Sequence, residues 1–146
     1  MRRDREAIQV IRCFLLDMDG TIYLGDQLIE GTHAFLQAAK QSGRKVLFLT
    51  NNSSKNGETY LRKLSQMGID AGPEDVLTSG QAAAQTIMQR YPGKKVWVMG
   101  NDLLKEELCS LGLPVVEKEP DIVLTAFDTQ LTYQKLWDCC DYVRQG

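Results

Sequence analysis

Two carboxylates stand two residues apart directly behind an apolar run near the start of the chain. Asp17 and Asp19 follow the four apolar residues 13–16, and Gly20 comes next. Such a run is typical of a buried parallel strand, and open α/β sheets bind their ligands at the carboxyl ends of these strands. Glycine permits a sharp turn there. We therefore expect Asp17 and Asp19 to project at a sheet edge where chemistry takes place.

Two negative side chains this close repel each other, and a bound cation would offset the repulsion. Oxygen ligands favour Mg²⁺, which keeps several waters and takes one or two carboxylates together with phosphate oxygens of a substrate. Asp17 and Asp19 are therefore candidate Mg²⁺ ligands, and phosphate is the expected substrate group. One carboxylate could attack phosphorus while the other protonates the leaving oxygen. The plainer interpretation, a turn or helix cap, suits a lone aspartate better than this pair.

A second apolar run, residues 45–49, also ends in polar residues. Thr50, Asn51 and Asn52 follow it, and then two serines. If the two strands are parallel neighbours, the Thr50 hydroxyl and the next amides lie at the same sheet edge as Asp17. A hydroxyl and amides at a helix start suit a phosphoryl oxygen, so Thr50, Asn51 and Asn52, with Gly20, are the candidate phosphate-binding residues. The alternative is that residues 51–54 only cap the next helix, through Ser53 or Ser54.

Strand-length and helix-length apolar patterns alternate along the rest of the chain. This alternation predicts an α/β fold with a parallel sheet and right-handed crossovers. A short flap is expected at 23–29. Further strands are expected at 76–78, 95–99 and 121–127, and helices at 31–42, 56–67, 81–91, 102–111 and from 132 onward.

Polar residues outside the two strand ends have plainer explanations. Asn101 or Asp102 is better explained as a helix cap than as a third acidic site. His33, the single histidine, is expected on a solvated helix surface. Five residues of the last helix recur at helical spacing, and we expect them to face inward: Tyr133, Leu136, Trp137, Cys140 and Val143.

Composition excludes several classes of protein. Seventeen basic and nineteen acidic residues give a net charge of −2, and no basic patch is available for a nucleic-acid backbone. No run of eighteen apolar residues exists, so we expect no membrane span, and the charged start does not resemble a signal peptide. The four cysteines form no C-x-x-C pair. We expect reduced thiols in a cytoplasmic protein rather than disulfides or a zinc site. Neither a G-x-G-x-x-G motif nor a P-loop is present, which argues against a nucleotide site.

The motif Asp17-Met-Asp-Gly-Thr21, with Thr50-Asn-Asn52 at the next strand end, resembles the haloacid dehalogenase superfamily of phosphohydrolases. The sequence around both motifs is similar to that of the 4-nitrophenylphosphatase or NagD-like branch, which carries an inserted α/β cap of type IIA. The resemblance implies a Rossmann-like catalytic core, in part at 1–79, and an incomplete cap at 80–146, with a hinge at 78–80. It also implies Mg²⁺ as cofactor and small phosphorylated metabolites as substrates.

The resemblance implies a role for each matching residue. Asp17 would be the nucleophile and a metal ligand, and Asp19 the general acid and base and a ligand through its carbonyl. Thr50 would bind the phosphoryl group, assisted by amides near Asn51. The family completes its site with a lysine and a Gly-Asp motif after the cap, and this chain lacks both. We therefore expect a truncated phosphatase with little activity of its own, and an exposed apolar edge at 14–16 that favours self-association.

Two rival functions remain. The first is a non-catalytic module that binds a metal or a phosphate group and recognises a partner. The second is a glycosyltransferase with a D-x-D pair, which would leave Thr50 to Asn52 without a role. A lysine and a Gly-Asp pair encoded downstream would favour the phosphatase over the module.

Overall fold

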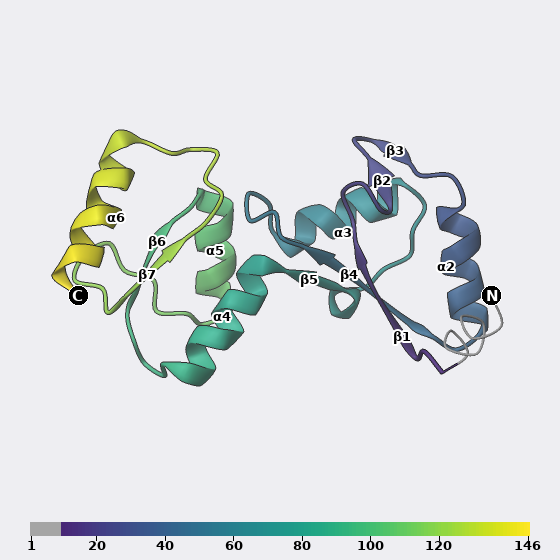
Figure 1. The fold of residues 1–146 in the computed structure, drawn as a ribbon, viewed down its shortest axis with the longest axis horizontal. Coiled ribbons are helices and arrows are strands. Elements are labelled where there is room, and N and C mark those ends of the chain that lie inside the picture. Colours follow the sequence, from purple (N-terminus) through teal and green to yellow (C-terminus); the bar gives the residue numbers. More distant parts are fainter. Residues whose placement is uncertain (1–9) are drawn as a thin grey trace. The chain divides into compact units, whose positions relative to one another are not determined.

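The computed structural model describes residues 10–146, and Figure 1 shows the order of its helices and strands. The described chain divides into two compact units, and the chain passes between them more than once. The first unit comprises residues up to 50 together with 60–77, and the second comprises 51–59 together with 78–146. The division into a core at 1–79 and a cap at 80–146 concerns the family's domains and stays a prediction.

The first unit is built on a three-stranded sheet with β4 (Lys45–Thr50) between β1 (Cys13–Asp17) and β5 (Val76–Thr78). β1 and β4 are parallel, as predicted. With the helices between the strands, this gives the mixed α/β fold that the alternating sequence patterns predict. The other elements of this part of the chain are the hairpin strands β2 (Tyr23–Leu24) and β3 (Gln27–Leu28), α2 (Thr32–Gln41), α3 (Gly57–Gln66) and the 3₁₀ turn η1 (Pro73–Asp75).

β1 is an edge strand, so the prediction that it is buried on both faces was wrong. Its residues alternate between exposed and half-buried, and Leu15 is 63% exposed. Cys13, expected inside, also carries an exposed thiol. The reason is that β1 has a described neighbour only in β4, and an apolar run shows that a strand can be buried but not what covers it. The exposed apolar edge expected at 14–16 is therefore observed.

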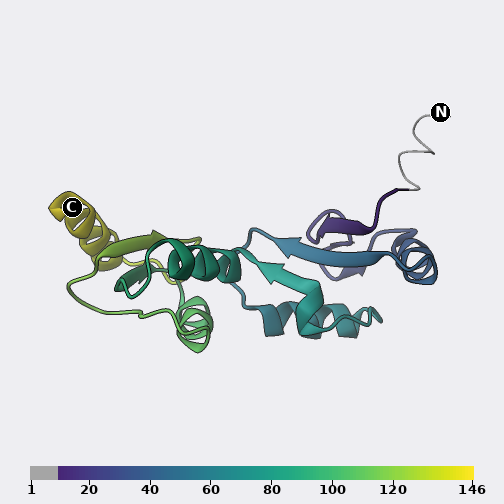
Figure 2. The same ribbon diagram turned by 90° about the horizontal axis from the view of Figure 1, so that it is seen from below.

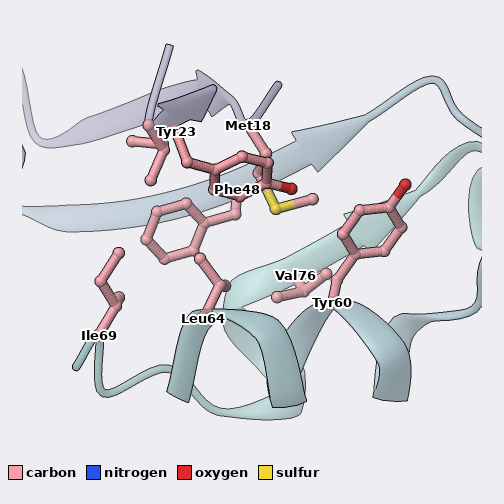
Figure 3. Packing of buried hydrophobic residues seen from close by; sticks show 8 residues of the cluster. Met18, Tyr23, Phe48, Tyr60, Leu64, Ile69 and Val76 are labelled. Carbon is pink, nitrogen blue, oxygen red and sulfur yellow. The ribbon is translucent and has the colours of Figure 1, made fainter. Parts of the chain in front are cut away.

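The core of the first unit lies between the sheet and α3. Figure 2 shows α3 along one face of the sheet, and Figure 3 shows Tyr60 and Leu64 reaching from this helix toward Phe48 on β4. The helix supplies its predicted inner face, with Leu64 fully buried and Tyr60 1% exposed. The loop after β1 completes the core with Met18 and Tyr23, both fully buried. The segment that carries the two carboxylates is thus anchored by one buried side chain between them and another after them.

The second unit contains a parallel pair of strands, β6 (Val96–Met99) and β7 (Ile122–Thr125). The predicted range was one residue too long for β6 and three residues too long for β7. The extra residues are polar or do not pair with the neighbouring strand. The helices are α4 (Ser79–Arg90), α5 (Asp102–Ser110) and α6 (Tyr133–Gln145). α4 packs against α5, and α6 contacts both strands.

The predicted inner face of α6 is exposed, which corrects the sequence interpretation. Tyr133 is 77% exposed, Trp137 55% and Val143 62%, whereas the buried residue of the helix is Cys139. α6 meets the strands through Cys139 and through Tyr142, whose ring lies 5.5 Å from that of Trp97. The apolar spacing identifies a stripe on the helix but not whether another element covers it.

The residues predicted as a hinge form the end of β5 and the first turn of α4. Thr78 is the N-cap of α4, since its hydroxyl accepts a hydrogen bond from the Gln81 amide at 3.0 Å. In return the Gln81 side chain accepts a hydrogen bond from the Thr78 amide at 3.1 Å, which completes a capping box. The Thr78 hydroxyl also donates to Glu107 at 3.3 Å.

Replacing this cap weakens the second unit. We expect Thr78→Ala to lower the free energy of unfolding by about 1–2 kcal/mol, because helix amides lose their acceptor. Both tryptophans, Trp97 and Trp137, lie in the second unit, so urea unfolding followed by their fluorescence measures the loss. Thr86→Ala is the control, since the Thr86 hydroxyl only donates to a carbonyl within the same helix. Equal stability of the two variants would contradict the capping role.

Among residues 10–146, no helix combines the length and apolar character that crossing a bilayer requires.

Candidate active site

The register of the sheet brings Asp17 and Thr50 to the same edge. Asp17 is the last residue of β1 and stands opposite Leu49 in β4, so Thr50 is the next residue along the neighbouring strand. Both strands are parallel, and their carboxyl ends therefore coincide, as ligand binding in open α/β sheets requires. The Asp17 side chain is exposed, whereas Thr50 is 6% exposed. The two strands thus end in a carboxylate and a hydroxyl at one edge of the sheet.

The segment after Asp17 folds back on itself around one carbonyl group. The carbonyl of Met18 accepts hydrogen bonds from the amides of Thr21, Ile22 and Tyr23 at 3.2, 2.9 and 3.3 Å. Gly20 has a φ of +86°, a backbone conformation that favours glycine, and its amide donates to the Tyr23 carbonyl at 2.8 Å. This turn keeps Asp19 exposed beside Asp17.

The carboxylate of Asp17 is itself held by the turn. Its Oδ1 accepts a hydrogen bond from the Met18 amide at 2.9 Å. The second oxygen, Oδ2, has no hydrogen bond described for it, and an ionised carboxylate oxygen is a nucleophile and a metal ligand. One oxygen is therefore fixed by the backbone while the side chain reaches solvent.

The negative charges of both carboxylates influence the same two buried phenols. Burial raises the pKa of Tyr60, and the negative charges of Asp19 and Asp17 raise it further, whereas the hydrogen bond with Thr50 lowers it. Burial also raises the pKa of Tyr23, with Asp19, Tyr60 and Asp17 adding to the effect. Asp17 and Thr50 end adjacent strands at the same sheet edge, and Asp19 follows Asp17 in the turn after β1.

Asn51 and Asn52 belong to the second unit, and the contacts described for them lie within it. The Asn51 carbonyl accepts a hydrogen bond from the Ser79 hydroxyl at 3.2 Å. The Asn52 side chain accepts from the amide and the hydroxyl of Ser54 at 2.9 and 2.7 Å, an arrangement that shapes the loop. Their predicted role in phosphate binding stays a prediction, as does that of Gly20.

The expectation that Ser53 or Ser54 caps the next helix was wrong. The cap of α3 is Asn56, whose Oδ1 accepts hydrogen bonds from the amide and the hydroxyl of Thr59 at 3.0 and 2.7 Å. The Ser53 hydroxyl instead accepts from the Phe127 amide at 2.8 Å. Because α3 begins at Gly57, the amides after Thr50 are those of a loop and not of a helix start. By contrast, Asn101 caps α5 as predicted, accepting from the Leu104 amide at 3.0 Å.

The metal donors that the described residues offer are few. Within 10–146 no group of three or more histidine, cysteine and acidic side chains is placed to hold a metal ion. Asp17 and Asp19 stay the predicted metal ligands. A set of one or two carboxylates, completed by waters and phosphate oxygens, is the usual environment of Mg²⁺ and a poor one for softer metals.

Tyr60 is the neighbour of the site that sequence reasoning missed. It was assigned only to the inner face of its helix, yet its phenol oxygen accepts a hydrogen bond from the Thr50 hydroxyl at 3.4 Å. The available signal was chemical: a tyrosine in a core position needs a partner for its hydroxyl. A threonine ten residues earlier, at a strand end, was a candidate for that partner.

The comparison with protein families decides the identity of the fold. Residues 14–114, more than half of the chain, match the model of the haloacid dehalogenase-like hydrolases. The chain belongs to this family. The resemblance predicted from Asp17, Asp19 and Thr50 is thereby confirmed at the level of the haloacid dehalogenase-like hydrolases, and the match begins at the strand that carries Asp17.

Named relatives of this haloacid dehalogenase-like chain are phosphatases. An acid sugar phosphatase of Staphylococcus aureus is 38% identical over 136 residues, which cover 92% of this chain and 52% of that protein. The structure of a 4-nitrophenylphosphatase from Thermotoga maritima is 38% identical with a TM-score of 0.89, and the match covers 93% of this chain and 52% of that one.

A third relative carries a metal. The structure of a glycerol phosphate phosphatase from Mycobacterium tuberculosis in complex with magnesium is 32% identical to this chain with a TM-score of 0.82. The match covers 94% of this chain and 43% of that one. The chain thus spans about half the length of the relatives that it matches.

Proposed function

We propose that the protein to which this chain belongs hydrolyses phosphate monoesters of small metabolites, in a Mg²⁺-dependent reaction that passes through a phosphorylated Asp17. The observation that carries the proposal is the register of β1 and β4, with Asp17 opposite Leu49 and Thr50 next to it. A nucleophile and a phosphate-binding hydroxyl at one strand edge are the positioning that phosphoryl transfer needs.

The residues divide the reaction between them. The Asp17 carboxylate attacks phosphorus, and the bond between phosphorus and the ester oxygen breaks while Asp19 donates a proton to that oxygen. Water then attacks the phosphorus of the acyl phosphate, Asp19 takes a proton from it, and inorganic phosphate leaves as the Asp17 carboxylate re-forms. Throughout, the Thr50 hydroxyl donates a hydrogen bond to a phosphoryl oxygen.

The donor set at the site fits a hard divalent cation. Asp17, through its carboxylate, and Asp19, through its backbone carbonyl, would hold Mg²⁺, and the remaining positions would be filled by water and a phosphoryl oxygen. When bound, Mg²⁺ supplies positive charge that offsets the two carboxylates and the phosphate. The relative that was solved with magnesium supports this choice of metal.

The class of substrate rests on the relatives. They are named an acid sugar phosphatase, a 4-nitrophenylphosphatase and a glycerol phosphate phosphatase, and each name refers to a small molecule. We expect a small phosphorylated metabolite as partner, no nucleic acid and no membrane, and a cytoplasmic location where thiols stay reduced. The exposed Leu15 on the edge strand favours a homo-oligomer.

Removal of the metal tests the proposal. We expect EDTA to lower the rate of 4-nitrophenyl phosphate hydrolysis by the full-length protein about 100-fold, since a catalytic metal contributes several kcal/mol to transition-state stabilisation. Excess MgCl₂ should restore the rate, and KCl of equal ionic strength should not. From the 146-residue chain alone we expect little turnover, because within 10–146 no group of three or more histidine, cysteine and acidic side chains is placed to hold a metal ion.

Other outcomes of these experiments would favour the non-catalytic module. A rate that is unchanged by EDTA would contradict the Mg²⁺ site. Binding of inorganic phosphate in the presence of Mg²⁺, without any hydrolysis by the full-length protein, would favour a binding module over the phosphatase.

A further inference from the structure

Lys63 on α3 contacts the β2–β3 hairpin, which follows the two carboxylates in the chain. Its Nζ lies 3.9 Å from the centre of the Tyr23 ring in β2 and 3.9 Å from Oδ1 of Asp26 in the turn of the hairpin. All three residues belong to the first unit. The Lys63 side chain is 18% exposed, whereas that of Asp26 is fully exposed. An exposed ion pair contributes little, and a cation–π contact strengthens as water is excluded, so the contact with the ring is the stronger of the two.

Tyr23 connects this contact to the turn that carries Asp19. The Tyr23 amide donates to the Met18 carbonyl at 3.3 Å, and the Tyr23 carbonyl accepts from the Gly20 amide at 2.8 Å. These two hydrogen bonds pair the backbones of Asp19 and Tyr23 as an isolated bridge. The turn therefore closes on Tyr23, and the position of this residue determines where Asp19 lies.

Within the described part of the chain, the Tyr23 side chain is held by its ring and not by its hydroxyl. Tyr23 is fully buried, in the core cluster with Met18 and Phe48 (Figure 3). Its hydroxyl has no hydrogen-bond partner among the described residues. A ring that packs on these neighbours and has the Lys63 ammonium on its face has little freedom to move. The turn that hydrogen-bonds to its backbone shares this restriction.

We propose that Lys63 is a positioning residue for the general acid: its ammonium fixes the Tyr23 ring, and thereby the turn that places Asp19 for proton transfer to the leaving oxygen. Lys63 itself does not touch the substrate. This inference rests on the proposed function, because it takes Asp19 as the general acid. A plainer role for Lys63 is its favourable charge in the last turn of α3. Loss of that charge would lower stability and would affect all esters alike.

The leaving group distinguishes the two roles. 4-Nitrophenolate leaves readily without a proton, whereas the phenolate of phenyl phosphate leaves less readily and depends more on a general acid. In the full-length protein we expect Lys63→Met to lower kcat about threefold with 4-nitrophenyl phosphate and about 30-fold with phenyl phosphate, with KM within about twofold. Lys63→Arg should retain kcat within about threefold for both esters, because a guanidinium also makes cation–π contacts. Equal losses with the two esters would overturn the proposal.

Two further variants locate the effect. Lys40→Met removes a lysine of the same unit whose side chain is 81% exposed and pairs with Asp70 at 3.4 Å. We expect it to leave kcat for both esters within about twofold of the wild type. Tyr23→Leu removes the ring and should give the same dependence on the leaving group as Lys63→Met, without a further loss when the two changes are combined. Additive losses would show that Lys63 does not act through Tyr23.

Hydrogen exchange separates this inference from the proposed function, since it needs no turnover. Peptides that span 17–28 report on the turn and the hairpin, and mass spectrometry of the full-length protein resolves them. We expect Lys63→Met to speed amide exchange in these peptides about tenfold and Lys40→Met to leave it unchanged. If exchange responds in this way but the wild type hydrolyses neither ester, the phosphatase proposal fails and the anchoring of the turn by Lys63 stands. If the esters are hydrolysed and Lys63→Met leaves exchange in 17–28 unchanged, the positioning role fails alone.

Discussion

Asp17→Asn should lower the kcat of the full-length protein toward 4-nitrophenyl phosphate by at least about 10⁴-fold, as the loss of a nucleophile does in other enzymes. An amide nitrogen does not attack phosphorus, and the remaining amide oxygen is a weak nucleophile. The fold should tolerate the change, because an asparagine Oδ1 can still accept the 2.9 Å hydrogen bond from the Met18 amide. Steady-state kinetics with 4-nitrophenyl phosphate measure the effect.

A second neutralised carboxylate controls for loss of charge. Asp70→Asn changes an exposed acid in the same unit, whose side chain is 94% exposed and pairs loosely with Lys40 at 3.4 Å. We expect its kcat to stay within about twofold of the wild type, since exposed pairs contribute little. Appreciable turnover by Asp17→Asn would contradict the assignment of Asp17 as the nucleophile, whatever the kcat of Asp70→Asn.

Lys135→Met should destabilise the second unit by about 3 kcal/mol, because it leaves a buried carboxylate without its cation. The Lys135 Nζ donates to Asp128 Oδ2 at 2.8 Å and to the carbonyls of Gly100 and Gln130 at 3.1 and 3.2 Å. The Asp128 side chain is 1% exposed. Methionine keeps much of the apolar stem of lysine but removes all three hydrogen bonds. Urea unfolding followed by tryptophan fluorescence reports on this unit.

An exposed ion pair in the same unit supplies the comparison. Lys94 and Asp121 pair at 2.9 Å, with side chains 55% and 36% exposed. Lys94→Met should therefore cost much less stability than Lys135→Met. If the two variants unfold at the same urea concentration, burial of Asp128 does not set the stability of this loop. Asp128→Asn combined with Lys135→Met should recover part of the loss, since no charge is then left buried.

The placement of Asp17 and Thr50 at one sheet edge was predictable because it depends on local pattern and one topological rule. An apolar run that stops at Asp17 and another that stops at Thr50 fix two strand ends, and parallel pairing brings these ends together. The register with Asp17 opposite Leu49 agrees with that inference. The cap at Asn101 likewise depends on residues within one helical turn.

What the sequence left undetermined depends on contacts between distant segments. The stripe on α6 that includes Trp137 was predicted to be buried, but burial requires a covering element, and the helix meets its sheet through Cys139 instead. The cap of α3 was missed because Ser53, which looked available, binds the amide of Phe127 from 74 positions further along. The contact of Tyr60 with Thr50 was missed for the same reason. The spacing of apolar residues on a helix predicts which face of the helix is buried, but not which side chain of another element contacts that face.

The segment 51–59 matters for the choice of fragment boundaries when the second unit is expressed by itself. Three of its groups hold the second unit: the Ser53 hydroxyl binds the Phe127 amide, the Ser54 carbonyl accepts from Asn101, and the Gly57 amide donates to Glu107. An expression fragment that starts at codon 79 would discard all three. Phe127, Asn101 and Glu107 would then lose these hydrogen-bond partners, so we expect a fragment of this half to be more stable when residues 51–59 are supplied with it, as a separate peptide or by circular permutation.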